Sequence, residues 1–147
     1  MGVKNDCKQP LLVVCAIIQK DNKILIARRG NDGSVGEGKW EFPGGKVEYL
    51  EDPKDAVTRE VDEELKLDIE VNSLFAINSH VYQRKDFLLH IILMSYLCDY
   101  VSGEIKLDSH EEAKWILIEE FDKYNFADAD YPIIEELLDY YLEENVE

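Results

Sequence analysis

The sequence has few cysteines, few basic residues and no long apolar run, and each shortage excludes a class of protein. The three cysteines, Cys7, Cys15 and Cys98, are odd in number and follow no metal-binding spacing. We therefore expect reduced thiols in a cytoplasmic protein. The longest apolar stretches, residues 11–18 and 87–97, are too short to span a membrane. The first ten residues also lack the basic and then apolar order of a signal peptide.

Acidic residues outnumber basic ones, 32 to 16, which gives a formal net charge of −16. Residues 119–147 alone carry eleven acids and one lysine. A surface of this sign repels nucleic-acid polymers and anionic membranes, so neither is an expected partner. It remains compatible with small phosphorylated substrates, which can arrive as metal complexes.

The length of 147 residues, without internal repeats or a low-complexity linker, predicts a single domain over residues 1–147 with a core at about 10–142. β-branched and aromatic content predicts strands, and apolar residues at helical spacing predict a final helix. We expect an α+β fold in which two helices pack against a mixed sheet. The predicted strands are residues 11–19, 23–28, 40–42, 69–81, 87–98 and 113–118, and the predicted helices are 53–65 and 133–142.

The mid-chain helix lies in the segment GKVEYLEDPKDAVTREVDEELKL, which covers residues 45–67. Asp52 and Pro53 predict its start, because aspartate is a favoured N-cap and proline is favoured at the first helical position. Val57, Val61 and Leu65 fall on one arc of about 80°, which predicts the buried side of the helix.

Glu60, Glu63 and Glu64 fall on a neighbouring arc of about 100° of the same helix. Like charges at this spacing disfavour an isolated helix by roughly 0.2–0.5 kcal/mol per pair, so they call for a compensating cation. Arg59 alone cannot neutralise three carboxylates, but it is placed to orient them. A hard divalent ion such as Mg²⁺, which prefers oxygen ligands, would fit. The alternative is an ordinary solvated acidic face, which is the usual meaning of a charge run.

The segment resembles the signature of the Nudix hydrolases, G-x5-E-x7-R-E-U-x-E-E-x-G-U, where U is an aliphatic residue. One position departs from it, because Lys66 stands where the family has its second glycine. A lysine there costs about 1–2 kcal/mol if the helix still ends in the left-handed conformation. The matching residues are Gly45, Glu51, Arg59, Glu60, Val61, Glu63, Glu64 and Leu67.

The resemblance implies an α/β/α sandwich around a mixed sheet and the hydrolysis of a nucleotide's diphosphate linkage. By position in the motif, Mg²⁺ (or Mn²⁺) would be bound by Glu60, Glu63, Glu64 and the backbone carbonyl of Gly44. Arg59 would orient these ligands.

Further acidic residues are implied around this box. Glu51 and Glu48 would assist the site through water or an additional metal ion; their alternative is an ordinary polar loop. The general base is left open between Glu63 and a glutamate ahead of the strand that contains Trp115. That glutamate is Glu111 or Glu112, and either could instead be a surface residue in a turn.

Residues 39–46, KWEFPGGK, look like the corresponding loop of MutT-like nucleoside triphosphate pyrophosphohydrolases. By that similarity Phe42 would pack near the base, while Arg29 and Lys46 would approach phosphates. For the two basic residues the alternative is exposed charges that flank a turn.

Asp130 stands before the last helix, where MutT-like enzymes place a residue that reads the base. An ionised aspartate accepts hydrogen bonds, so it could meet an exocyclic amino group such as that of cytosine. Asp128 and Asp130 are also good N-caps for the last helix, and both interpretations can hold together.

These patterns predict a Mg²⁺-dependent pyrophosphohydrolase that converts a nucleoside triphosphate, with cytosine or an oxidised purine, to the monophosphate and pyrophosphate. We expect a monomer or homodimer. Two alternatives remain. One is hydrolysis of another nucleotide diphosphate, such as ADP-ribose or a dinucleotide polyphosphate. The other is a nucleotide-sensing module without turnover.

Overall fold

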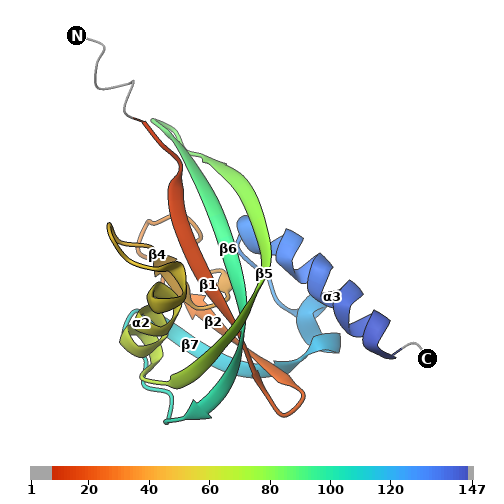
Figure 1. Ribbon diagram of the computed structural model, residues 1–147. Helices are drawn as coiled ribbons and strands as arrows, with labels where there is room; N and C mark the ends of the chain where they lie inside the picture. Colours follow the sequence, from red (N-terminus) through yellow and green to blue (C-terminus); the bar gives the residue numbers. More distant parts are fainter. Residues whose placement is uncertain (1–7, 146–147) are drawn as a thin grey trace.

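Two long, nearly uncharged strands form the centre of the fold, β1 (Leu11–Lys20) and β6 (Leu88–Ser102) (Figure 1). They run parallel, with Leu11 opposite Ile91, in a computed structural model that describes residues 8–145 and the side chains up to residue 142. A turn at Asp21, which has a φ of 58°, joins β1 to β2 (Lys23–Arg29) as an antiparallel hairpin.

Every other strand pairing in the sheet is antiparallel, so the sheet is mixed, as predicted. The path through the sheet is β3-β2-β1-β6-β5, while β4 pairs with β1 and β7 pairs with β2. The remaining strands are β3 (Trp40–Glu41), β4 (Gly44–Lys46), β5 (Asp68–Gln83) and β7 (His110–Leu117).

One long helix covers each face of the sheet (Figure 1). Helix α2 (Pro53–Leu65) buries the predicted Val57, Val61 and Leu65 against one face. Helix α3 (Tyr131–Asn145) buries Ile133 and Leu137 against the other. The predicted α/β/α sandwich is therefore confirmed.

The boundaries differ from the predicted ones where backbone contacts decide them. Strand β3 ends before Phe42, and β4, which was not predicted, forms because Gly44 and Gly45 pair with β1. Ile118 begins the 3-10 segment η1 (Ile118–Lys123) instead of ending a strand, because the Glu120 side chain accepts a hydrogen bond from the backbone N–H of Leu117. A second 3-10 turn, η2 (Asp128–Asp130), precedes α3.

Cys15 and Cys98 are free and buried, and burial raises the pKa of both thiols. Both are therefore protonated, unreactive core residues. Cys7 lies outside the described residues. No helix within residues 8–145 combines the length and apolarity needed to cross a membrane.

Both ends of α2 follow the sequence pattern. The Asp52 side chain accepts a hydrogen bond from the backbone N–H of Lys54 at 2.8 Å, as an N-cap does. At the other end Lys66 adopts the left-handed conformation, with a φ of 59°, and its N–H donates to the Asp62 carbonyl. The helix thus keeps a glycine-type ending with a residue that is strained in it.

Replacing Lys66 with glycine should therefore stabilise the protein. Relief of about 1–2 kcal/mol of strain is offset by about 0.4–1 kcal/mol of extra unfolded-state entropy, which leaves a net gain of about 0.5–1 kcal/mol. Chemical denaturation would measure it. Thr58→Gly, in the interior of the same helix, is the matched control and should lose roughly 0.3 kcal/mol, the difference between the helix propensities of threonine and glycine. A destabilised Lys66→Gly would contradict the strain at this position.

Candidate active site

The carboxylates of α2 that face the sheet lie against the backbone of β4, at its two glycines. A Cβ atom on Gly44 would overlap the carbonyl oxygen of Val14 in β1, and one on Gly45 would overlap the carboxylate of Glu60. The backbone N–H of Gly44 donates to Glu64 Oε1 at 3.3 Å. Glycine at position 44 is therefore required for β4 to pair this closely with β1, and glycine at position 45 leaves room for the Glu60 carboxylate against the backbone.

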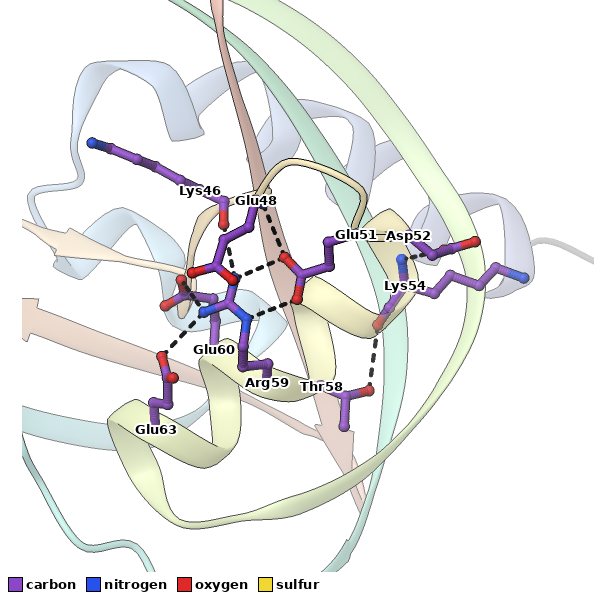
Figure 2. A network of polar contacts seen from close by, with 9 residues as sticks. All are labelled: Lys46, Glu48, Glu51, Asp52, Lys54, Thr58, Arg59, Glu60 and Glu63. Atoms are coloured by element: carbon purple, nitrogen blue, oxygen red, sulfur yellow. Dashed lines mark hydrogen bonds and ion pairs between the residues drawn. The ribbon is translucent and has the colours of Figure 1, made fainter.

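Arg59 gathers three carboxylates around its guanidinium group (Figure 2). Its Nε and Nη2 contact the two oxygens of Glu51 at 2.7 and 3.0 Å. Its Nη1 lies 3.0 Å from Glu60 and 3.1 Å from Glu63, and Nη2 also donates to the Lys46 carbonyl at 3.0 Å. The orientation of box carboxylates that the sequence suggested for Arg59 is therefore present in its geometry.

The carboxyl groups of this cluster have very different proton affinities. The hydrogen bond from Arg59, followed by that from the Glu48 backbone, lowers the pKa of Glu51 to about 2. Burial raises the pKa of Glu60, against the effect of Arg59. Burial, followed by the charges of Glu41 and Glu60, raises the pKa of Glu64 to about 9. The guanidinium of Arg59 therefore stabilises the ionised form of Glu51, while the ionised form of Glu64 has no comparable stabilisation.

The donor set fits a hard divalent cation. Glu60 and Glu64 present oxygen ligands side by side, and no lysine, arginine or histidine among residues 8–145 forms an ion pair with Glu64. In the same part of the chain, no three His, Cys, Asp or Glu side chains already form a closed metal site. Mg²⁺ does not require one, because it is typically bound by one or two carboxylates together with waters and substrate phosphates.

A cavity of about 570 Å³ opens beside these glutamates. Its wall includes apolar side chains of β1 and β6, such as Val13 and Ile91. A mostly apolar cleft with a few converging polar groups is the usual form of a small-molecule site. Several predicted site residues line it together, namely Arg29, Phe42, Gly44, Lys46, Glu60, Glu64 and Asp130.

Asp130 is the buried acid of this cavity, with 5% of its surface exposed. Its Oδ2 accepts a hydrogen bond from the backbone N–H of Phe42 at 3.3 Å, across 88 residues of sequence. Burial, followed by the charge of Glu41, raises its pKa well above the ordinary value. Asp130 is also the last residue before α3, and its predicted role as an N-cap of that helix stays a prediction.

The other candidates lie outside the cavity wall. The Glu63 side chain is 58% exposed and contacts Arg59 at the solvent edge of the box. Glu111 and Glu112 both pair with Arg28 of β2, at 3.1 and 3.5 Å. The choice of general base among these three stays a prediction.

Sequence reasoning missed two residues of the site, Glu41 and His110. His110 Nε2 lies 2.8 Å from Glu41 Oε2, and Glu41 Oε1 lies 3.6 Å from Arg29 Nη1. Glu41 lines the cavity, and all three residues line a smaller one of about 60 Å³ that Glu64 also borders. Glu41 and His110 are 69 positions apart in the chain, and neither lies in the acidic signature. No local sequence pattern therefore predicts that they form a pair.

The NUDIX domain model matches residues 8–137, which is most of the chain. The chain belongs to the Nudix family. Within it, the matched region includes the whole signature from Gly45 to Leu67 and extends through the cavity wall to Asp130.

The curated relatives of this Nudix protein are named for different nucleotide substrates. The CTP pyrophosphohydrolase of Escherichia coli K12 is 36% identical over 123 residues, 84% of this chain and 87% of the relative. The ADP-ribose pyrophosphatase of Methanocaldococcus jannaschii is 36% identical over 118 residues, 80% and 68% of the two chains. The 8-oxo-dGTP diphosphatase of E. coli K12 is 31% identical over 130 residues, 88% and 97%.

Among solved structures, a MutT NUDIX hydrolase from Burkholderia pseudomallei superposes with a TM-score of 0.78 at 29% identity. The match covers 88% of this chain and 99% of that one. The Nudix sandwich is thus shared along nearly the entire length of both proteins.

The buried Asp130 should make the stability of this Nudix protein depend on pH. A carboxyl whose pKa is higher in the folded state destabilises the fold as pH rises, because the unfolded chain releases its proton first. The contribution of Asp130 to stability is thus fully present below about pH 4, the ordinary aspartate pKa. It is lost as the pH rises from there towards the raised folded-state pKa.

Asp130→Asn keeps an oxygen for the Phe42 N–H and removes the charge. In thermal unfolding with chelator present, its melting temperature relative to wild type should be several degrees higher at pH 8 than at pH 4.5. Asp128→Asn, at an exposed neighbouring position, is the control and should show no such difference. Equal offsets at both pH values for Asp130→Asn would contradict a raised pKa at Asp130.

Proposed function

We propose that this Nudix hydrolase is a Mg²⁺-dependent nucleoside triphosphate pyrophosphohydrolase, with Mn²⁺ as an alternative ion. It would convert a ribo- or deoxyribonucleoside triphosphate, with cytosine or an oxidised purine favoured, to the monophosphate and pyrophosphate. One observation carries the proposal: Glu60 and Glu64 of the signature helix line the same cavity as the buried Asp130. A single nucleotide could therefore meet the carboxylate box and Asp130 together.

In this proposal the metal ligands are Glu60, Glu63, Glu64 and the carbonyl of Gly44. Support comes from the burial of Glu60 and Glu64 and from the lack of an ion-pair partner for Glu64 among the described residues. When bound, Mg²⁺ would neutralise phosphate oxygens and acidify a water molecule. Glu63 would exchange its contact with Arg59 for this role, which its exposed position allows.

The basic residues of the cavity would position the phosphates, because phosphoryl transfer depends mainly on positioning and charge stabilisation. Arg29 and Lys46 line the cavity that Glu60 and Glu64 border. Arg59 is fully occupied by carboxylates and the Lys46 carbonyl, so it would orient ligands instead of binding substrate. Glu51, ionised by its bond to Arg59, would hold that guanidinium in place, with Glu48 nearby to assist.

A general base would take the proton of the attacking water. Glu63 is our first assignment, because it is exposed and adjoins the box. Glu112, or its neighbour Glu111, is the second. Both lie on β7 and are already paired with Arg28, so either would have to leave that contact.

The base would enter the apolar part of the cavity beside Phe42. Asp130 has one oxygen engaged by the Phe42 N–H, which leaves the other for the base. A carboxyl oxygen can accept a hydrogen bond from an exocyclic amino group, and cytosine offers one. The similarity to the E. coli CTP pyrophosphohydrolase supports the same substrate class.

Hydrolysis of ADP-ribose is the alternative that a specific observation favours, since the M. jannaschii ADP-ribose pyrophosphatase is as similar in sequence. The carboxylate box suits both chemistries. Free nucleotides in the cytoplasm, rather than nucleic-acid polymers or membranes, are the partners that fit a net charge of −16, for a protein acting as monomer or homodimer.

A product assay tests the proposal directly. CTP, dCTP, 8-oxo-dGTP, GTP, ADP-ribose and a dinucleotide polyphosphate would each be incubated with Mg²⁺ and, separately, with chelator. We expect one triphosphate to give monophosphate and pyrophosphate only with Mg²⁺. Turnover confined to ADP-ribose or the dinucleotide would overturn the base assignment. Nucleotide binding without turnover of any compound would indicate a sensing module.

Glu64→Gln should reduce metal-dependent turnover at least about hundredfold, more than the loss of a residue that merely supports a ligand usually costs. The fold should remain, because glutamine has nearly the same shape and can still accept from the Gly44 N–H. Asp62→Asn, exposed on the same helix, is the matched control and should keep wild-type rates. Undiminished turnover in Glu64→Gln would refute its assignment as a ligand.

A further inference from the structure

Glu41 occupies the centre of the site without belonging to the signature helix. Its side chain is 17% exposed and lines both the large cavity and the smaller one beside it. Its negative charge raises the pKa of both Glu64 and Asp130. A partly buried carboxylate in this position needs its own partners, and within the described part of the chain it pairs with His110 and Arg29.

His110 provides the short contact. Because an ionised carboxylate can only accept, His110 Nε2 donates to Glu41 Oε2 at 2.8 Å. The imidazole is 3% exposed, and its Nδ1 is buried with no hydrogen-bond partner among the described residues. The bond to Glu41 is therefore the interaction that orients the ring.

Arg29 provides the long contact. Its Nη1 lies 3.6 Å from Glu41 Oε1, beyond the 2.7–2.9 Å of a direct charge-assisted hydrogen bond. Its Nη2 donates to Ser34 Oγ at 2.9 Å, while its buried Nε has no partner within the described part of the chain. Arg29 thus retains unused donors at a cavity that is proposed to receive phosphates.

Strand pairing sets this arrangement. Arg29 and His110 are opposite each other on β2 and β7, directly after an irregularity in register between Arg28 and Arg29. Before it, Arg28 is opposite Glu112 and forms the outer ion pairs. The shift in register places Arg29 and His110 together beside the smaller cavity.

We propose that His110 is a positioning residue for substrate phosphates: it holds Glu41 back from Arg29, so that the guanidinium stays available to the nucleotide. Without the His110 bond, Glu41 would close onto Arg29 as a direct ion pair and occupy its donors. This inference rests on the proposed function, since it assumes that Arg29 meets phosphate. The competing explanation is that His110 only fills space between β2 and β7.

Three variants separate these explanations. His110→Ala removes the bond to Glu41. His110→Gln restores a side-chain N–H at a similar reach, so it should rescue positioning if the bond is what matters. His90→Ala is the control: His90 lies on β6, contacts Ser79 on β5 and lines neither cavity. Melting temperatures would be recorded for all three.

The primary measurement is the affinity for inorganic pyrophosphate with Mg²⁺, by calorimetric titration, with the free nucleoside as a probe that carries no phosphate. For His110→Ala we expect pyrophosphate affinity to fall about tenfold, the equivalent of one weakened charge-assisted bond. Nucleoside affinity should not change. The KM for the preferred triphosphate should rise by the same factor with a much smaller change in kcat, and His110→Gln should recover most of the loss.

Equal weakening of pyrophosphate and nucleoside binding, or no rescue by His110→Gln at wild-type stability, would show a space-filling role and overturn the inference. Unchanged pyrophosphate affinity in His110→Ala would do the same. If His110→Ala does not fold, His110→Gln and Glu41→Gln carry the test. Glu41→Gln weakens the attraction to Arg29, so it should leave pyrophosphate affinity at or above the wild-type value. A wild-type protein that binds pyrophosphate but hydrolyses no triphosphate would refute the proposed function and leave this test intact.

Discussion

The close contact between α2 and the glycine backbone of β4 is the constraint on which the site depends. Gly44 lies against Val14 of β1, and Gly45 lies against the carboxylate of Glu60. The apolar side of α2 is buried on the sheet at the same time, through Val57 and Val61. The burial of one side of the helix therefore brings Glu60 and Glu64 against backbone and largely out of water, where like charges repel most strongly.

The electrostatics of the site follow from that forced proximity. Arg59 pairs with Glu51 and Glu60, and its hydrogen bond lowers the pKa of Glu51 to about 2. It does not reach Glu64, where burial and the charge of Glu41 raise the pKa to about 9. The cavity beside Glu64 therefore lacks positive charge, and a divalent ion arriving with a nucleotide would provide that charge. The network of Glu41, His110 and Arg29 has the same origin, because carboxylates outnumber basic side chains around the cavity and Glu41 is paired with two of the latter.

Local patterns predicted most elements and the signature residues. The β-branched and aromatic content indicated the strands β1, β2, β5 and β6, and the helical spacing of Val57, Val61 and Leu65 indicated the buried side of α2. The prediction was wrong where a distant contact or a single hydrogen bond sets the boundary. β4 exists because β1 pairs with it, and Ile118 leaves β7 because Glu120 caps the following turn.

The sequence by itself determined the acidic helix, its N-cap at Asp52, its strained end at Lys66 and the family that these residues identify, because each depends on neighbours within one or two helical turns. Only the tertiary structure decided which carboxylates share the cavity. Asp130 meets Phe42 across 88 residues, and His110 meets Glu41 across 69. Such contacts arise from strand order and register, which bring distant segments together, and a burial-raised pKa exists only after that packing has removed water.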